Sequence, residues 1–181
     1  ILLESEYIRA AVGGTGFAKT GGNYAASLKA AQKAEEKGYT QVLWLDAKER
    51  KYVEEVGTMN MFFVFDDEVV TATFTVSILP GVTRDSVLTI LKDWGIDANE
   101  RKITIDEVIE NAKSGKLVEA FGSGTAAVIT PVGSLHYNGT DYEMGGDKSK
   151  VGELTQKLYN YLTGIQYGRE EDKFGWIEKI E

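Results

Sequence analysis

The sequence predicts one α+β domain in which many short strands are covered by helices on the outside. Three observations point to this class. The chain has 181 residues, the size of one ordinary domain with a core large enough to fold without staples. Its apolar residues fall mostly into short runs bounded by Gly, Pro, Asn or Asp. Segments with helical periodicity separate these runs, and no internal repeat or linker divides the chain.

The first predicted elements are a strand and a helix around a glycine-rich segment. Residues 7–12 alternate well enough for a strand. A helix is expected after Gly22, with Asn23 as its cap and Gly38 as its end. Its periodicity places four side chains on the buried face: Tyr24, Leu28, Ala31 and Ala34.

Strands and a second helix are expected next. The predicted strands share short apolar sequences: 41–45, 52–56, 61–65 and 69–74. Asp66-Asp67 is a hairpin turn before the last of them. Pro80-Gly81 then turns the chain into a helix that begins near Thr83 and ends at Gly95. Its apolar side chains recur at i, i+3, i+4 and i+7: Val87, Ile90, Leu91 and Trp94.

The last part of the chain contains two more predicted helices. Thr104-x-x-Glu107 is a capping box for a short helix, which carries Val108, Ile109 and Ala112. Strands follow at 117–121, 128–132 and 135–137, then the hairpin signal Asn138-Gly139 and a glycine-rich loop to Asp147. Ser149 is expected to cap the last helix, whose inward side chains are Val151, Leu154, Leu158, Tyr161 and Leu162.

Composition excludes several classes of function. The formal charge of −8 argues against non-specific nucleic-acid binding, which needs a basic face. No cysteine is present, and the single histidine, His136, cannot form a histidine metal cluster; we expect it at a surface or sheet edge. No apolar run is long enough to cross a bilayer, and we see no signal peptide, so a cytoplasmic protein without metal is expected.

Lys19 lies between two glycine-rich turns. Glycines on both sides let the backbone pass close to a bound group, and a buried lysine with a lowered pKa is a nucleophilic amine. A solvated loop lysine would have the same local sequence. The segment from Lys19 to Tyr24, Lys-Thr-Gly-Gly-Asn-Tyr, nevertheless resembles the lysine segment of the branched-chain amino-acid aminotransferases. These are pyridoxal-phosphate enzymes of fold type IV.

Further segments resemble the same family in the same order, and the resemblance covers essentially the whole chain. They are Gln41-Val42-Leu43-Trp44-Leu45, Glu55-Val56-Gly57-Thr58-Met59-Asn60, Leu79-Pro80-Gly81-Val82-Thr83-Arg84, Phe121-Gly122-Ser123-Gly124-Thr125-Ala126 and Ile165-Gln166-Tyr167-Gly168. The resemblance implies the family's large domain, a pseudo-barrel of mixed sheet with helices packed outside. It also implies that residues 1–181 form only the C-terminal, cofactor-binding domain, without the family's small N-terminal domain.

The resemblance assigns the two residues that act on the cofactor ring. Lys19 matches the Schiff-base lysine, which would be both tether and general acid–base. Glu55 matches the acid that keeps the ring nitrogen protonated. Glu54 is the competitor, but neighbours on a strand face opposite ways, so only one can point at the ring. The motif selects Glu55, and Glu54 is expected to be solvated.

Two turns are the expected phosphate site. Gly81, Val82 and Thr83 lie at a predicted helix N-terminus, where free N–H groups favour an anion. Thr83 could equally be a plain helix cap. Gly124 and Thr125 follow a strand in a Gly-x-Gly turn, where backbone N–H groups can form a nest. Arg9 is either an extra cation near the phosphate or part of an ion pair within the fold.

The remaining site residues are carried over from the family by their positions in the motifs. Tyr24 matches the tyrosine near the cofactor's phenolic oxygen, and Leu79 matches the residue packed on the ring. Thr58, with backbone from Thr125 and Ala126, matches the substrate-carboxylate side of the pocket. Some family members have a Cys-x-x-Cys redox switch after this turn; Ala127 and Thr130 occupy those positions here.

The resemblance implies an aminotransferase that moves the amino group of leucine, isoleucine or valine to 2-oxoglutarate. The complete protein would act on branched-chain amino acids and 2-oxo acids as a homodimer. Two alternatives share the fold type, a D-amino-acid aminotransferase and an aminodeoxychorismate lyase. A third alternative is that the 181 residues are a non-catalytic, cofactor-binding fragment, and we expect them to be inactive alone.

Overall fold

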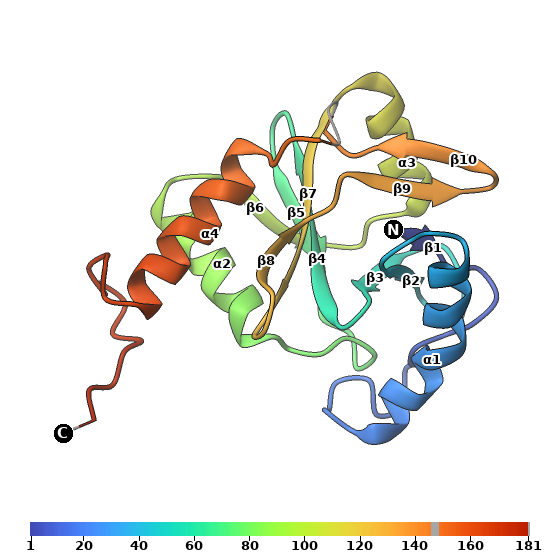
Figure 1. Ribbon diagram of the computed structural model, residues 1–181, viewed down its shortest axis with the longest axis horizontal. Coiled ribbons are helices and arrows are strands. Elements are labelled where there is room, and N and C mark those ends of the chain that lie inside the picture. Colours follow the sequence, from blue (N-terminus) through green and yellow to red (C-terminus); the bar gives the residue numbers. More distant parts are fainter. Residues whose placement is uncertain (146–148, 181) are drawn as a thin grey trace.

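A mixed sheet runs through the molecule, and helices pack on both of its sides (Figure 1). The computed structural model describes residues 1–145 and 149–180. Within them the strands are β1 Leu2–Leu3, β2 Val42–Leu45, β3 Val53–Val56, β4 Met59–Phe65, β5 Val69–Ala72, β6 Ala98–Arg101, β7 Leu117–Gly124, β8 Val128–Pro131, β9 Ser134–Tyr137 and β10 Thr140–Glu143. The helices are α1 Gly21–Glu36, α2 Val82–Asp93, α3 Ile105–Ser114 and α4 Glu153–Gln166. The predicted α+β class with outer helices is confirmed.

The sheet branches at β4. One path runs in the order β10-β9-β1-β2-β3-β4-β5-β6, while β7 pairs with both β4 and β8. β3 pairs with the start of β4, at Met59 and Asn60, and β5 pairs farther along, from Phe62 to Val64. Between them the hydroxyl of Thr71 donates to the carbonyl of Met61 at 2.7 Å. The start of β4 is therefore where β3, β7 and the loop after β5 converge.

β4 contributes to the apolar core on both sides of the sheet. Phe62 stacks on Phe121 of β7 with ring centroids 4.9 Å apart, in the cluster that α2 and α4 cover. Phe63 and Phe65 belong to the cluster that α3 covers. Successive side chains of a strand point to opposite faces, so a strand buried on both sides needs a continuous apolar sequence.

The first predicted strand is wrong. Residues 7–12 form no strand; the parallel strand here is β1, at Leu2–Leu3. After β1 the carboxylate of Glu4 accepts hydrogen bonds from the backbone N–H groups of Glu6 and Tyr7. This local turn takes the chain out of the sheet before residue 7.

The predicted buried face of α1 is also wrong in part. Asn23, Ala30 and Ala34 are buried, whereas Tyr24 and Leu28 are 43% and 68% exposed, and Ala31 is exposed. The helix cap is Thr20, not Asn23. Asn23 instead donates from Nδ2 to the carbonyls of Thr15 and Ala18, both at 2.8 Å. The end near Gly38 is as expected, since Gly38 has φ of +81°.

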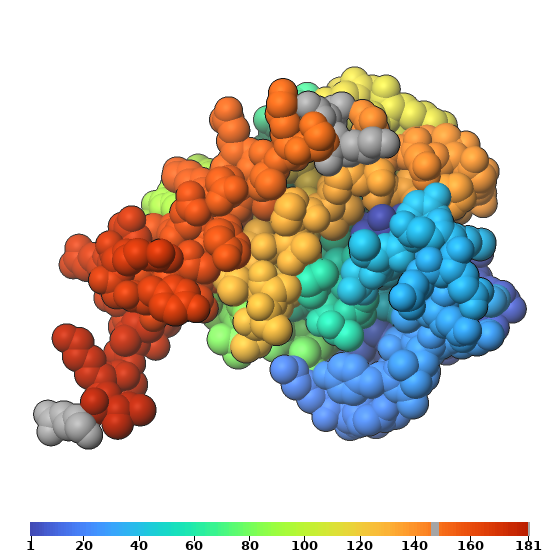
Figure 2. Space-filling model, viewed as in Figure 1, coloured from blue at the N-terminus to red at the C-terminus, as the bar shows by residue number. Residues whose placement is uncertain are grey.

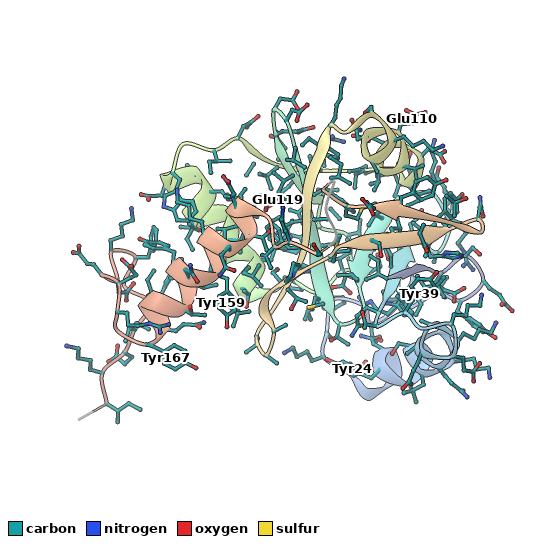
Figure 3. All side chains as sticks on the ribbon, turned by 45° about the horizontal axis from the view of Figure 1, so that its top comes forward. Tyr24, Tyr39, Glu110, Glu119, Tyr159 and Tyr167 are labelled. Atoms are coloured by element: carbon teal, nitrogen blue, oxygen red, sulfur yellow. The ribbon has the colours of Figure 1, made fainter. Side chains whose placement is uncertain are left out.

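Two strands and the start of α4 differ from the prediction. β6 was not predicted, and β10 occupies part of the expected glycine-rich loop, whose end at Asp147 lies outside the described residues. α4 begins after Gly152, so Ser149 is not its cap and Val151 lies outside it, half exposed. The carboxylate of Glu119, beside the start of α4 in Figure 3, accepts from the N–H groups of Leu154 and Thr155 at 2.9 and 2.8 Å. A residue from β7 thus caps this helix.

The other predicted helices, α2 and α3, are confirmed. α2 buries Val87, Ile90 and Leu91 as expected. The side chain of Thr104 caps α3 by accepting from the N–H of Glu107 at 3.1 Å. His136 lies in β9, where its Nδ1 is 2.7 Å from a carboxylate oxygen of Asp141.

A membrane-spanning helix needs a long apolar sequence, and none of the helices within the described residues has one.

Candidate active site

A cavity opens where the start of β4 meets the loops before α1 and α2 and the turn after β7. Figure 2 shows the surface between the blue glycine-rich segment and the gold β7–β8 turn, which border it. Every residue that the sequence assigns to the site lines this cavity: Lys19, Tyr24, Glu55, Thr58, Leu79, Gly81, Val82, Thr83, Gly124, Thr125 and Ala126. Residues far apart in the sequence therefore come together as expected, although their roles remain a proposal.

Glu55 lies at the buried floor of the cavity and is 2% exposed. Its Oε1 accepts from the backbone N–H of Leu79 and from Asn60 Nδ2, both at 3.2 Å. Its Oε2 forms an ion pair with Arg9. Burial raises the pKa of Glu55 to about 7, against the opposing effect of the Arg9 charge. The carboxyl is thus held in one orientation and titrates near neutrality.

Arg9 forms the ion pair that the sequence left as one of two possibilities. Its Nη2 donates to the carbonyl of Ser77 at 2.6 Å and reaches the carbonyl of Gly16 at 3.4 Å. It therefore joins Glu55 to the glycine-rich segment before Lys19 and to the loop after β5. A single guanidinium fixes three parts of the site relative to one another.

Glu54 is not solvated, contrary to the expectation. It is 6% exposed, and its Oε1 accepts a hydrogen bond of 2.5 Å from the hydroxyl of Ser77. It does not line the cavity, in agreement with the argument that neighbours on a strand face opposite ways. Burial raises the pKa of Glu54, while the Ser77 hydrogen bond and the Arg9 charge lower it. The loop after β5 covers this second carboxyl.

Lys19 lines the cavity and is exposed. The segment before it is held closely: a side chain at Gly16 would overlap the backbone of Ser77. Tyr24, at the start of α1 in Figure 3, is also exposed. The wall of the cavity formed by this segment and by Thr125 and Ala126 faces solvent.

The N-terminus of α2 offers free backbone donors to the cavity. Gly81 is the N-cap and no side chain caps the helix. Thr83 therefore lies inside the first turn, and its alternative interpretation as a plain cap is wrong. A Cβ at Gly81 would overlap Oδ1 of Asn60, so a side chain there would require the amide of Asn60 to shift. Gly124 and Thr125 approach the same cavity from β7, so both expected anion-binding turns border it.

Two polar residues of the cavity, Asn60 and Ser123, were missed by the sequence reasoning. Asn60 pairs with Glu55 across β3 and β4, and with Ser123 across β4 and β7. Asn60 Nδ2 also donates to the carbonyl of Leu79 at 3.0 Å. Asn60 belongs to the Glu55–Asn60 motif and Ser123 to the Phe121–Ala126 motif. Their membership of these motifs was the only indication in the sequence that they belong to the site.

The fold and the cavity define a mixed-sheet domain that places an amine, a buried carboxylate and anion-binding backbone turns around one small-molecule site. This chain belongs to the class IV aminotransferase family: the sequence model of the family described as Amino-transferase class IV matches residues 16–135. The family resemblance drawn from the motifs is therefore confirmed.

Curated relatives match nearly the whole chain. Branched-chain-amino-acid aminotransferase 2 of Bacillus subtilis (strain 168) is 56% identical over 180 residues, which cover 99% of this chain and 49% of the relative. Branched-chain-amino-acid transaminase 1 of the same strain is 52% identical over 99% of this chain and 50% of its own length. The chain spans about half the length of these relatives.

Solved structures agree in fold. The branched-chain amino acid aminotransferase from Escherichia coli is 32% identical with a TM-score of 0.81, and the match covers 98% of this chain and 56% of that one. A second branched-chain amino acid aminotransferase, from T.th. and complexed with N-(5'-phosphopyridoxyl)-L-glutamate, is 32% identical with a TM-score of 0.82. That match covers 98% of this chain and 55% of that one.

Proposed function

We propose that the complete protein is a pyridoxal-phosphate-dependent branched-chain amino-acid aminotransferase. It would transfer the amino group of leucine, isoleucine or valine to 2-oxoglutarate. The observation that carries this proposal is the convergence of Lys19, Glu55 and two anion-binding turns on one cavity. The names of relatives that are 52–56% identical support branched-chain substrates over D-amino acids and over lyase chemistry.

The residues of the cavity fit pyridoxal phosphate in their chemistry. The helix N-terminus at Gly81–Thr83 and the turn at Gly124–Thr125 would hold the phosphate through backbone N–H groups. Glu55 would accept a hydrogen bond from the ring nitrogen, and Leu79 would pack on the ring. Tyr24 would lie near the phenolic oxygen. When bound, the cofactor supplies an electron-withdrawing ring that stabilises negative charge at the substrate Cα.

Glu55 would hold a proton at the ring nitrogen. Its Oε1 already accepts two hydrogen bonds and its Oε2 faces Arg9, so a remaining lone pair of Oε2 is the acceptor we propose. Burial raises the pKa of this carboxyl, and the charge of Arg9 opposes that rise. Arg9 is thus a positioning residue in this proposal.

Lys19 would bind the cofactor covalently and would move a proton at the substrate Cα. Lys19 and Glu55 line the same cavity, which supports this assignment. Thr58 and the backbone of Thr125 and Ala126 would bind the substrate carboxylate. All of these residues border the same opening.

We further propose that the complete protein is a cytoplasmic homodimer and that the 181 residues alone do not support turnover. The exposure of Lys19 and Tyr24 supports the second part, because proton transfer at a substrate Cα needs a site closed to water. The match to only about half of each relative supports it too.

The test uses the complete protein loaded with pyridoxal phosphate. It should absorb visible light, lose that band on borohydride reduction, and carry the reduced cofactor on Lys19 in a peptide map. Leucine should be a substrate and D-alanine should not. Labelling of Lys29 in α1 instead of Lys19, or turnover of D-alanine in preference to leucine, would contradict the proposal.

A further inference from the structure

Ser123 is a buried hydroxyl in the cavity wall without a hydrogen-bond partner among the described residues. It is 1% exposed and lies near the end of β7. Buried hydroxyls in folded proteins are almost always hydrogen-bonded, because an unpaired one loses its interactions with water without compensation. A lone buried donor in the wall of a binding cavity therefore points to a bound group that would accept from it.

Ser123 is the last member of a polar row across three strands. Glu55 of β3 pairs with Asn60 of β4, and Asn60 pairs with Ser123 of β7. Paired residues of antiparallel strands lie on the same face, and neighbouring strands are about 4.8 Å apart. The row therefore extends roughly 10 Å from the backbone of Glu55 to the backbone of Ser123. Glu55 and Asn60 form hydrogen bonds with protein groups, whereas Ser123 forms none in the part of the chain that the structure describes.

The Ser123 end of the row is also the end with the anion-binding donors. Gly124 and Thr125 follow Ser123 directly, and the uncapped N-terminus of α2 borders the same cavity. Met59 packs against Gly122 and Gly124, on the face of β7 opposite to Ser123. The side chain of Ser123 therefore points away from Met59, and the backbone donors of Gly124, Thr125 and the α2 N-terminus border the same cavity.

We propose that the Ser123 hydroxyl donates a hydrogen bond to the phosphate monoester of the cofactor. Ser123 thereby adds a side-chain donor to the backbone donors of the two turns. This inference rests on the proposed function, since the phosphate is that of pyridoxal phosphate. It assigns the two ends of the row to the two ends of the cofactor, Glu55 to the ring nitrogen and Ser123 to the phosphate.

The experiment compares Ser123→Ala with the unchanged complete protein in its apo form. Dissociation constants are measured for pyridoxal phosphate, for pyridoxal, which has no phosphate, and for inorganic phosphate by competition. Ser123→Ala should bind pyridoxal phosphate about tenfold more weakly or worse, since a hydrogen bond to a charged group is lost. It should bind inorganic phosphate more weakly too, and pyridoxal as before. Ser114→Ala, at the exposed end of α3, is the matched control and should change none of these constants.

A second measurement separates ligand binding from folding. The urea midpoint of the apo protein should stay the same or rise in Ser123→Ala, because the hydroxyl has no hydrogen-bond partner to lose within residues 1–145 and 149–180. Unchanged affinity for pyridoxal phosphate, equal weakening for pyridoxal, or a marked loss of apo stability would each overturn the inference. The complete protein could fail to turn over leucine while its affinity for phosphate still depends on Ser123. That result would refute the proposed reaction but would support this inference.

Discussion

Arg9 and Glu55 form a buried ion pair that ties the segment before Lys19 to the floor of the cavity. The side chain of Arg9 is only 10% exposed, and the same guanidinium donates to the carbonyl of Ser77. A buried ion pair holds its partners in one geometry, and removal of one partner leaves the other charge uncompensated. Arg9 therefore holds the orientation of Glu55, and its charge opposes the rise in the pKa of Glu55 that burial causes.

Arg9→Met should destabilise the protein by about 3 kcal/mol or more, because it leaves a buried carboxyl without its counter-charge. The unfolding free energy in urea near neutral pH measures this loss. The double variant Arg9→Met/Glu55→Gln should recover part of the stability, since the uncompensated charge is gone. Equal stability of Arg9→Met and the unchanged protein would show that the pair contributes nothing.

The stability of the apo protein should depend on pH through Glu55. The pKa of Glu55 is raised to about 7 in the folded protein from 4.5, so between these values the folded state binds more protons than the unfolded chain. The unfolding free energy should therefore fall as pH rises through this window, by about 3 kcal/mol for this group. Glu54 contributes in the same direction, since its pKa is also raised.

Glu55→Gln isolates this contribution. The difference in unfolding free energy between the variant and the unchanged protein should shift in favour of the variant from about pH 4.5 to about pH 8. Glu178→Gln, in the exposed C-terminal segment, is the control for the replacement of a carboxyl by an amide. A constant difference for Glu55→Gln would mean that Glu55 titrates as in the unfolded chain.

Glu55→Gln in the complete enzyme should slow turnover of leucine by about 3 kcal/mol in the activation free energy, or about two orders of magnitude, while cofactor binding is largely kept. An amide cannot keep the ring nitrogen protonated. Glu54→Gln should have the smaller effect, because Glu54 faces Ser77 and not the cavity. Single-turnover absorbance measurements give the chemical step for both variants, and a larger defect in Glu54→Gln would reverse the assignment.

Gly16→Ala should displace the segment that carries Lys19. A methyl group at Gly16 would overlap the backbone of Ser77, which cannot move without the loop that covers Glu54. We expect a loss of about 1–3 kcal/mol of stability, as for overpacking in a core, together with weaker cofactor binding. Gly21→Ala, at the first residue of α1, has open space and should be neutral. Thermal unfolding measures the stability of both variants, and a visible-absorbance titration measures their cofactor binding. Equal stability and equal cofactor binding of Gly16→Ala and Gly21→Ala would contradict the prediction.

The sequence alone determined the features that depend on residues close together in the chain. The cap of Thr104 on Glu107 and the turn at Asn138-Gly139 form from their own local chemistry. Opposite orientations of Glu54 and Glu55 follow from strand geometry, and the structure agrees with them. The family motifs also identified residues that line one cavity. They could do so because a family resemblance carries three-dimensional information that local patterns lack.

Only the tertiary structure decided which surfaces are covered. Leu28 is exposed and Asn23 is buried in α1 because the glycine-rich segment, and not an apolar layer, packs beside Asn23. Glu54 is buried because the loop after β5 brings Ser77 over it. The buried, unpaired state of the Ser123 hydroxyl follows only from the way β4, β7 and α2 pack together in the fold. The burial and hydrogen bonding of a side chain depend on residues far away in the sequence. No local pattern in the chain specifies which of these residues will contact it.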